Sequence, residues 1–461
     1  MYFVLFLLLA SLLVSKPIPA LSAQETDQND LLVQLKQLEE VMKSQQKVIE
    51  ALKEKIESKE ETNHSPAPQW EEDEIEQVID NYLLKQETRK KMVKAGLLSD
   101  FHAYWDQGLK FKSEDGNFKF SVGGRIMNDW GWFNEDDDIK SAIGDQIDGA
   151  EIRSARFSMQ GSIYKNIGYK LELEYAGGNA NFADVFMELH EIPLLGNFRV
   201  GHMKDPFSLE KMDSRKYMTF MERGLNNAFT KLRNTGFTVY NHALKERITW
   251  SAGIFRNADN FGNSQGDSST EGSHNFSGRL TAVPWYEDKG RKLVHTGISY
   301  SYHNAFENRV RYRSRPEMNL ADIFVDTGDI NAESANLFNP ELAIVYGPFS
   351  FQAEYTYADI DLKRSADNDP RFTGFYAYGS YYLTGENRNY RRKEGVFDRT
   401  EPNKNFHWGS GEGKGAVELA ARYSELDLSD EGIEGGRLQD ITAGINWYLN
   451  PNTRVTLNYV H

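Results

Sequence analysis

The 461-residue chain combines 13% aromatic and 26% charged residues with no cysteine and a net charge of -15. Its length exceeds one ordinary soluble core, and a mean hydropathy of -0.61 excludes a bundle of membrane helices, which would need repeated apolar runs of about 20 residues. The lack of cysteine excludes disulfides and thiolate zinc sites, and the negative charge argues against a nucleic-acid partner, because phosphate backbones require a basic surface.

An apolar run at residues 1–15 opens the chain and is followed by Lys16, two prolines and the small residue Ala23. The run is too short to cross a bilayer comfortably, so it predicts a signal peptide over residues 1–23 that is cleaved near Ala23. No Lys or Arg precedes Lys16, which leaves an anchored helix or a wrongly assigned start as alternatives. Under each alternative the mature chain leaves the cytoplasm.

Residues 24–60 predict an α-helical coiled coil, because their apolar positions step by four and three. The seam contains Leu31, Leu35, Leu38, Met42, Ile49, Leu52 and Ile56, with the polar Gln45 suited to fix its register. A single amphipathic helix docked on its own protein is the alternative. Residues 61–98 then predict a linker, broken by Pro66 and Pro68, and an acidic helix.

Residues 99–461 alternate with a period of two, as in strands with one apolar and one wet face. Between residues 117 and 133, Phe118, Phe120 and Trp130 share one face, while Lys119 and Arg125 lie on the other. Such stretches, tight turns and long polar loops recur to the end of the chain and predict an all-β transmembrane barrel of about 16 antiparallel strands. Closure is required, because lipid accepts a sheet only when every backbone edge is paired.

The chain ends inside a stretch that reads as the last strand but one, and an odd number of strands cannot return both termini to the same side. We therefore expect that the closing strand is missing from a truncated product, or that an upstream segment takes its place. A soluble sandwich or propeller is the alternative to the barrel. The polar second face favours a water-filled lumen over a dry core, and no blade-length repeat is visible.

Four motifs in order make residues 99–461 resemble the phosphate-selective porin O and P family. They are Phe120-Ser-Val-Gly-Gly-Arg125, Ile152-Arg-Ser-Ala-Arg-Phe157, Val200-Gly-His-Met-Lys-Asp-Pro-Phe-Ser-Leu-Glu210, and Met218-Thr-Phe-Met-Glu-Arg223 with Arg233-Asn-Thr-Gly236. The resemblance implies a homotrimeric barrel in the bacterial outer membrane that prefers anions. It also implies that the loop after the fifth strand, residues 205–234 here, folds inward as the constriction.

The resemblance places the family's strand arginines on Arg125 and on the pair Arg153 and Ser154, so that one cation is absent. Alternation puts Arg125 and Arg156 on the wet face by itself. Arg153 instead shares its phase with apolar neighbours, so we expect a bulge or a rim position to bring it to water. The lost arginine leaves a general anion porin or a mixed porin open beside phosphate specificity.

In the inward loop the resemblance assigns constriction roles to Lys211, Ser214 and Arg223, while Arg215 replaces the family's second serine. Asp184 matches the acidic residue that faces the constriction. Guanidinium forks, Lys and Ser can replace the water of a dehydrating phosphate, and Asp184 would keep the ion from binding too tightly. The alternative is that each arginine only balances a luminal carboxylate.

The sequence thus predicts passive diffusion of phosphate, polyphosphate or other small anions, without catalysis, cofactor or metal. The partners expected are these anions, outer-membrane lipid and two further copies of the chain. The alternative function is a general porin that mainly anchors the outer membrane to peptidoglycan through a periplasmic coiled coil, using residues 24–95.

Overall fold

The computed structural model describes residues 101–461 except 107, 232, 265–273, 364–367 and 410–412. The predicted signal peptide, coiled coil, linker and acidic helix lie outside the described residues. Among the residues described, no helix is both long and apolar enough to cross a membrane.

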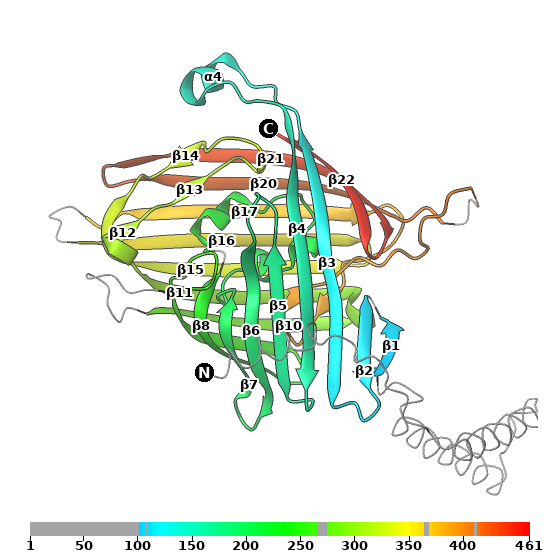
Figure 1. The fold of residues 1–461 in the computed structure, drawn as a ribbon. Helices are drawn as coiled ribbons and strands as arrows, with labels where there is room; N and C mark the ends of the chain where they lie inside the picture. The colour runs from blue at the N-terminus through cyan, green and yellow to red at the C-terminus, as the bar shows by residue number, and fades with distance from the viewer. Residues whose placement is uncertain (1–100, 107, 232, 265–273, 364–367, 410–412) are drawn as a thin grey trace, which may run out of the picture. The chain divides into compact units, whose positions relative to one another are not determined.

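Antiparallel pairing joins the strands into one 18-stranded sheet (Figure 1). In chain order these strands are β1 (Phe101–Trp105), β2 (Leu109–Ser113), β3 (Phe118–Gly131), β4 (Gly149–Ile163), β5 (Ile167–Glu174), β6 (Asn181–Ile192), β7 (Gly196–Met203), β8 (Asn234–Ala243), β9 (Ile248–Arg256), β10 (Asn275–Glu287), β11 (Lys292–Asn304), β12 (Arg309–Val310), β15 (Ile330–Tyr346), β16 (Phe349–Leu362), β17 (Arg371–Tyr382), β20 (Ala416–Asp430), β21 (Ile433–Asn450) and β22 (Thr453–Val460). The predicted antiparallel sheet is confirmed. The number of strands exceeds the expected one because β1, β2 and β12 are too short to give a clear alternation.

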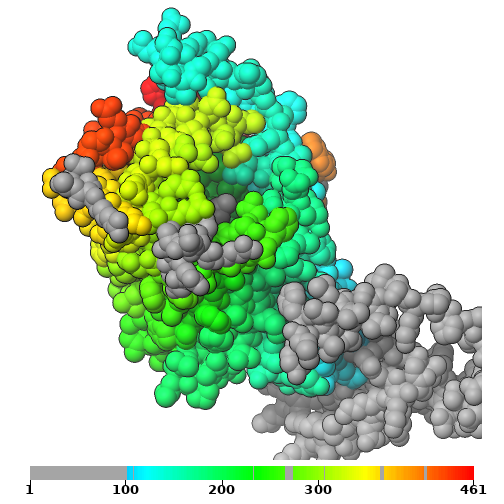
Figure 2. Space-filling model, turned by 60° about the vertical axis from the view of Figure 1, so that its left-hand side comes forward, coloured from blue at the N-terminus to red at the C-terminus, as the bar shows by residue number. Residues whose placement is uncertain are grey.

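The remaining elements are short and lie in the connections. They are two hairpins, β13 (Arg313–Ser314) with β14 (Val325–Asp326) and β18 (Tyr390–Arg391) with β19 (Val396–Phe397), and the helices α4 (Asp137–Ile143), α5 (Leu209–Met212), η1 (Arg215–Tyr217), η2 (Leu225–Phe229), η3 (Asp288–Gly290) and η4 (Phe306–Asn308). The hairpin of β3 and β4 carries α4 at its tip and projects beyond its neighbours (Figure 2).

The connections differ in length at the two ends of the sheet. Tight turns such as 164–166, 193–195 and 347–348 lie at one end, which we call the short-turn end. Long connections, among them 204–233 and 305–329, lie at the opposite, long-loop end. Two connections break this rule. Segment 383–415 between β17 and β20 is long yet starts from the short-turn end, and the two-residue turn 431–432 between β20 and β21 lies at the long-loop end.

The two faces of the sheet differ as the alternation predicts. Ile126 is 82% exposed and Trp130 62% exposed on the outer face of β3, whereas the side chain of Arg125, directly before Ile126, is only 11% exposed. Other strands expose large apolar side chains in the same way, among them Val200, Ile254, Leu280, Ile298, Leu342 and Ile445. A continuous apolar surface of this kind is rare on soluble monomers and suits lipid.

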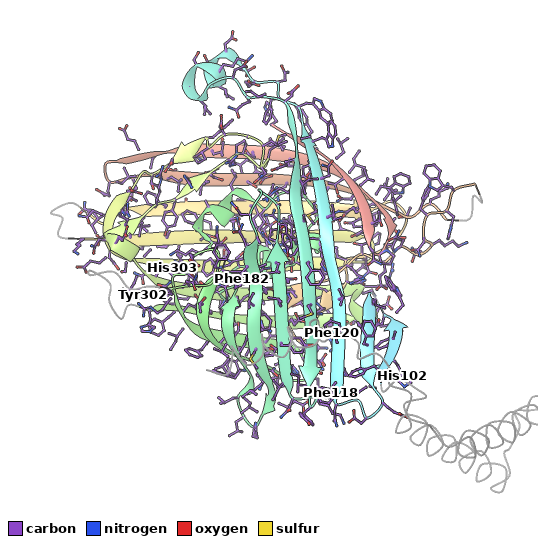
Figure 3. All side chains as sticks on the ribbon, viewed as in Figure 1. His102, Phe118, Phe120, Phe182, Tyr302 and His303 are labelled. Atoms are coloured by element: carbon purple, nitrogen blue, oxygen red, sulfur yellow. The ribbon has the colours of Figure 1, made fainter. Side chains whose placement is uncertain are left out.

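Aromatic side chains lie near several strand ends, three of which are labelled in Figure 3. Near the short-turn end, the ring of Phe118 lies 5.2 Å from that of Tyr164. Near the long-loop end, Phe182 packs on a loop aromatic at 6.0 Å, and Tyr302 on Phe276 at 6.4 Å. Aromatic girdles at both rims of an apolar band are typical of barrels in an outer membrane.

Segment 204–233 leaves β7, crosses the interior and returns to β8. The backbone N–H groups of Leu209 and Glu210 donate to the carboxylate of Glu354 on β16, at 2.9 and 2.8 Å. The N–H of Met221 donates to Asn458 of β22 at 2.9 Å, near one edge of the sheet. Since the same segment also reaches β4, described below, the sheet curves around it. The face that meets this segment is the inner face.

The outer edges of the sheet are formed by β1 and β22. Within the described residues, β22 pairs with β21 alone and β1 with β2 alone. The β1–β2 hairpin covers the edge of β3 from Lys119 to Val122. In the part of the chain that the structure describes, these two edges are therefore not paired with each other.

The two glycines that precede Arg125 are not equivalent. A Cβ atom at Gly124 would lie 2.1 Å from the carbonyl oxygen of Arg156, whereas one at Gly123 would meet nothing within 4 Å. We expect Gly124→Ala to destabilise the fold by about 1–3 kcal/mol, since the backbones of β3 and β4 must separate, and Gly123→Ala to be tolerated. Urea titration of the folded fraction in detergent, followed by gel mobility, checks this. Equal midpoints for both variants would contradict the steric argument.

Candidate functional site

An irregular register in β4 places three arginines on the inner face. Arg156 lies directly opposite Arg125 of β3, so both share that face. The pairing then shifts between Met127 and Asn128, which leaves Arg153 as an unpaired bulge residue. Alternation alone would turn Arg153 outward, and the bulge turns it inward instead. The bulge that the sequence required for Arg153 is therefore present.

Arg125 and Arg156 belong to one hydrogen-bonded group. The Nε of Arg125 donates to Ser154 at 2.8 Å, and Ser154 donates to Glu174 at 2.6 Å. Arg156 reaches Glu174 at 3.1 Å and Glu172 at 3.4 Å. Ser154, which stands where the family's second arginine was expected, thus relays a hydrogen bond instead of a charge. Both arginines are ion-paired, as the charge-balance alternative requires.

Segment 204–233 brings a second pair of arginines together. Glu222 accepts from the Nε of Arg153 at 2.5 Å and lies 3.4 Å from a terminal nitrogen of Arg215. One carboxylate of the loop therefore holds an arginine of the wall and one of its own segment. Sequence reasoning missed Glu222, although it lies beside Arg223 inside a recognised motif.

Asp184 of β6 is also held by two cations. Its carboxylate lies 2.8 Å from Lys170 and 2.6 Å from Arg233. Lys170 also lies 3.4 Å from Glu172, which links this group to Arg156. Neither Lys170 nor Arg233 was among the predicted site residues, although alternation puts Lys170 on the wet face and Arg233 opens a recognised motif. We call Arg125, Arg153, Arg156, Lys170, Arg215 and Arg233 the basic cluster.

The other predicted loop residues serve the loop itself. Arg223 donates to the backbone carbonyls of Glu210 and Asp213, at 2.9 and 3.3 Å. The Ser214 hydroxyl caps η1 by accepting from the N–H of Lys216 at 3.4 Å. Lys211 is only 5% exposed, and burial lowers the pKa of its ammonium to about 8 despite the attraction of Asp205. In the described part of the chain, no ion pair joins Lys211, Ser214 or Arg223 to the basic cluster.

Segment 305–329 adds arginines at the long-loop end. Arg309, Arg311, Arg313 and Arg315 are exposed on β12, β13 and their flanks. The alternate residue Tyr312 is buried instead, with its ring 5.0 Å from that of Phe229 in segment 204–233. Sequence reasoning missed this row, although its period of two is visible in the printed sequence.

Segment 383–415 meets segment 204–233 from the short-turn end. The N–H of Phe397 donates to Asp213 at 2.8 Å, and Arg388 lies 3.7 Å from the same carboxylate. Arg399 donates to the hydroxyl of Tyr217 at 3.2 Å. No pattern in the sequence predicted that this segment enters the interior.

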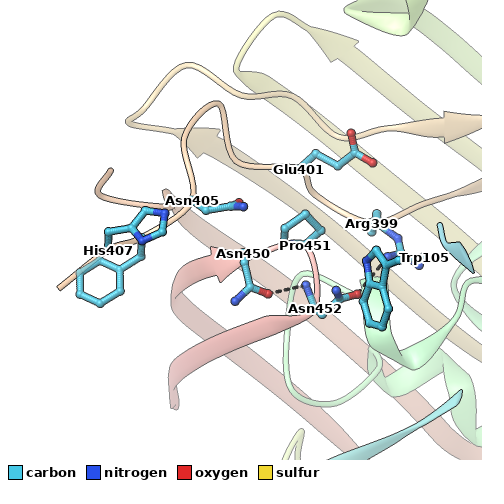
Figure 4. A pocket seen from close by; sticks show the side chains of 9 residues that line it. Trp105, Arg399, Glu401, Asn405, His407, Asn450, Pro451 and Asn452 are labelled. Carbon is cyan, nitrogen blue, oxygen red and sulfur yellow. Dashed lines mark hydrogen bonds between the residues drawn. The ribbon is translucent and has the colours of Figure 1, made fainter. Parts of the chain in front are cut away.

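A cavity of about 510 Å³ opens beside segment 383–415 (Figure 4). Its lining includes Trp105, Arg399, Glu401, Asn405, His407, Asn450, Pro451 and Asn452. Arg399 donates to Asn452 at 3.0 Å across it. The cavity shares no lining residue with the basic cluster. In the chain as described, no group of three or more His, Asp or Glu side chains is placed to hold a metal ion.

Comparison with known proteins extends these observations. The family "Phosphate-selective porin O and P" matches residues 120–461. Porin O of Pseudomonas aeruginosa is 26% identical over 391 residues, which cover 77% of this chain and 85% of that protein. An uncharacterised protein of Caulobacter vibrioides is 30% identical over 364 residues, which cover 77% of this chain and 70% of that one.

One of the similar solved structures is the anion-selective porin from Comamonas acidovorans. It is 12% identical, covers 74% of this chain and 88% of its own, and superposes with a TM-score of 0.46. The family match, in contrast, spans most of the chain, including all four motifs noted in the sequence. The chain therefore belongs to the phosphate-selective porin O and P family.

Proposed function

We propose that this chain forms an outer-membrane pore through which phosphate and related small anions diffuse passively, selected by the basic cluster. The charge balance of the ion pairs within the basic cluster carries the proposal. The six cations of the cluster pair with four carboxylates, Glu172, Glu174, Asp184 and Glu222. These ion pairs leave two positive charges over within the basic cluster, although the whole chain is acidic.

The geometry explains how an anion would be held and released. Each guanidinium has five N–H donors, so an arginine that pairs with one carboxylate keeps donors for a phosphate that sheds water. The paired carboxylates compete for those donors and keep the binding weak. A conducting site needs this balance, because the ion must both enter and leave.

The arginines of segment 305–329 support a role in capture. Arg309 and Arg311 pair with acidic residues of their own segment, and Arg313 lies between Arg311 and Arg315 on the same exposed side. A row of cations at a pore mouth raises the local anion concentration and speeds entry. We assign this row to steering and the basic cluster to selection. Lys211, Ser214 and Arg223 are proposed to shape segment 204–233.

The remaining expectations stay predictions. The apolar outer face and the aromatic rims support insertion in the outer membrane. A homotrimer and an attachment to peptidoglycan rest on the family resemblance and on residues 24–95, which lie outside the described residues.

Single-channel recording of the full chain in planar bilayers tests the proposed function. In a KCl gradient we expect a reversal potential of the anion-selective sign, and phosphate added at low millimolar concentration is expected to reduce the chloride current. Sulfate serves as the control anion for mere competition by charge. A reversal potential of the cation-selective sign would contradict the anion assignment, and equal block by phosphate and sulfate would contradict phosphate preference.

A further inference from the structure

Arg422 of β20 reaches from the wall to two inward segments. Its side chain is 1% exposed. The guanidinium Nη2 donates to the backbone carbonyl of Glu222 at 3.0 Å, and Nη1 lies 3.4 Å from the carboxylate of Glu210. The ring of Phe220 lies against the guanidinium carbon at 4.3 Å. Three residues of segment 204–233 are thus held by one side chain.

Glu317 of segment 305–329 occupies the remaining side of the guanidinium. It accepts from the Nε of Arg422 at 2.8 Å and also from Nη2. The hydroxyls of Ser424 and Thr442 donate to the same carboxylate, and the N–H of Glu317 donates to Asp440 at 2.9 Å. Segment 305–329 is therefore fixed to β20 and β21 at the point where Arg422 holds segment 204–233.

We infer that Arg422 is a positioning residue for anion selection. It fixes the backbone of Glu222, and the Glu222 carboxylate in turn binds Arg153 and Arg215. Arg422 itself contacts groups of the chain on all sides and acts on the ion only through this carboxylate. The inference rests on the proposed function, since it assigns a cause to the geometry of the basic cluster.

The shape of the arginine head is essential to this role. The contacts with Glu317, Glu210 and Glu222 use three different nitrogens of the guanidinium. A lysine has a single nitrogen and cannot reach all three at once. We therefore expect Arg422→Lys to keep the charge and release Glu222, so that Arg153 and Arg215 lose part of their partner.

The test measures phosphate block and reversal potential for wild type, Arg422→Lys, Glu222→Gln and the double variant. Arg422→Lys is expected to tighten phosphate block about threefold to tenfold, in the same direction as Glu222→Gln, because both changes deprive Arg153 and Arg215 of part of their carboxylate partner. The double variant reports the coupling, because coupled residues deviate from additivity. In the Glu222→Gln background it is expected to add nothing. Equal effects of Arg422→Lys in both backgrounds, or none in a folded single variant, would overturn the inference.

Two further variants serve as an alternative to Arg422→Lys and as a control. Glu317→Gln leaves Arg422 in place and is expected to act in the same direction more weakly, which covers the case that Arg422→Lys does not fold. Arg437→Lys changes an exposed arginine of β21 whose ion pair with Glu425, at 2.6 Å, includes no residue of either segment, and it is expected to behave as wild type. If wild type shows no phosphate block, the proposed function fails, while the coupling is still read from reversal potentials.

Discussion

Replacing Arg125 and Arg156 together with glutamine is expected to remove the anion preference of the channel. The basic cluster then has four cations against four carboxylates, so the two excess positive charges disappear. Glu172 and Glu174 also lose partners and become free to attract cations. Phosphate block is expected to weaken about 100-fold, from two charge-assisted contacts of about 1.4 kcal/mol each.

The reversal potential in a KCl gradient and the concentration of half-maximal phosphate block measure this change. Arg371→Gln is the matched control, because it removes an exposed arginine of β17 that pairs with Asp359 outside the cluster. An unchanged reversal potential in a folded double variant would show that these arginines only balance charge within the wall.

Glu222→Gln is expected to act in the opposite direction. The change frees Arg153 and Arg215 and raises the excess in the cluster from two positive charges to three. Phosphate block is expected to tighten about tenfold, as one additional charge-assisted contact provides about 1.4 kcal/mol. Single-channel phosphate current is expected to fall, because tighter holding slows exit.

Lowering the pH to about 5 is not expected to reproduce the effect of Glu222→Gln on phosphate block. Burial raises the pKa of Glu222, but the charges of Arg215 and Arg153 outweigh burial and hold the pKa below its ordinary value. The carboxylate therefore stays charged as the pH falls to about 5, since ordinary glutamate titrates near 4.3.

Glu425→Gln on β20 is the matched control for Glu222→Gln. If phosphate block tightens equally in Glu222→Gln and Glu425→Gln, the effect does not come from Glu222.

The parts of the fold that repeat along the chain were predictable. Alternation with a period of two gave the antiparallel sheet, its apolar outer face and the inward direction of Arg125 and Arg156. It also gave the right condition for Arg153, because a residue out of phase must sit at a bulge to face water. The family followed from four short motifs.

The pairings inside the bore were not predictable from such patterns. Arg153 and Glu222 are 69 positions apart, and their contact depends on where segment 204–233 crosses the interior. Lys211 was expected at the constriction, but its side chain is buried within the loop. The alternating arginines from Arg309 to Arg315 are visible in the sequence. The strands β12 and β13 have only two residues each, however, so the alternation is too short to predict which side of the molecule these arginines occupy.

Asp213 links segment 204–233 to segment 383–415. Its carboxylate receives the N–H of Phe397 and faces Arg388, both from segment 383–415, while its carbonyl accepts from Lys204 and Arg223. Shortening that segment would remove both partners from a carboxylate that is only 1% exposed in the intact chain. A change in the channel opening at the short-turn end would therefore also alter the segment that crosses the bore.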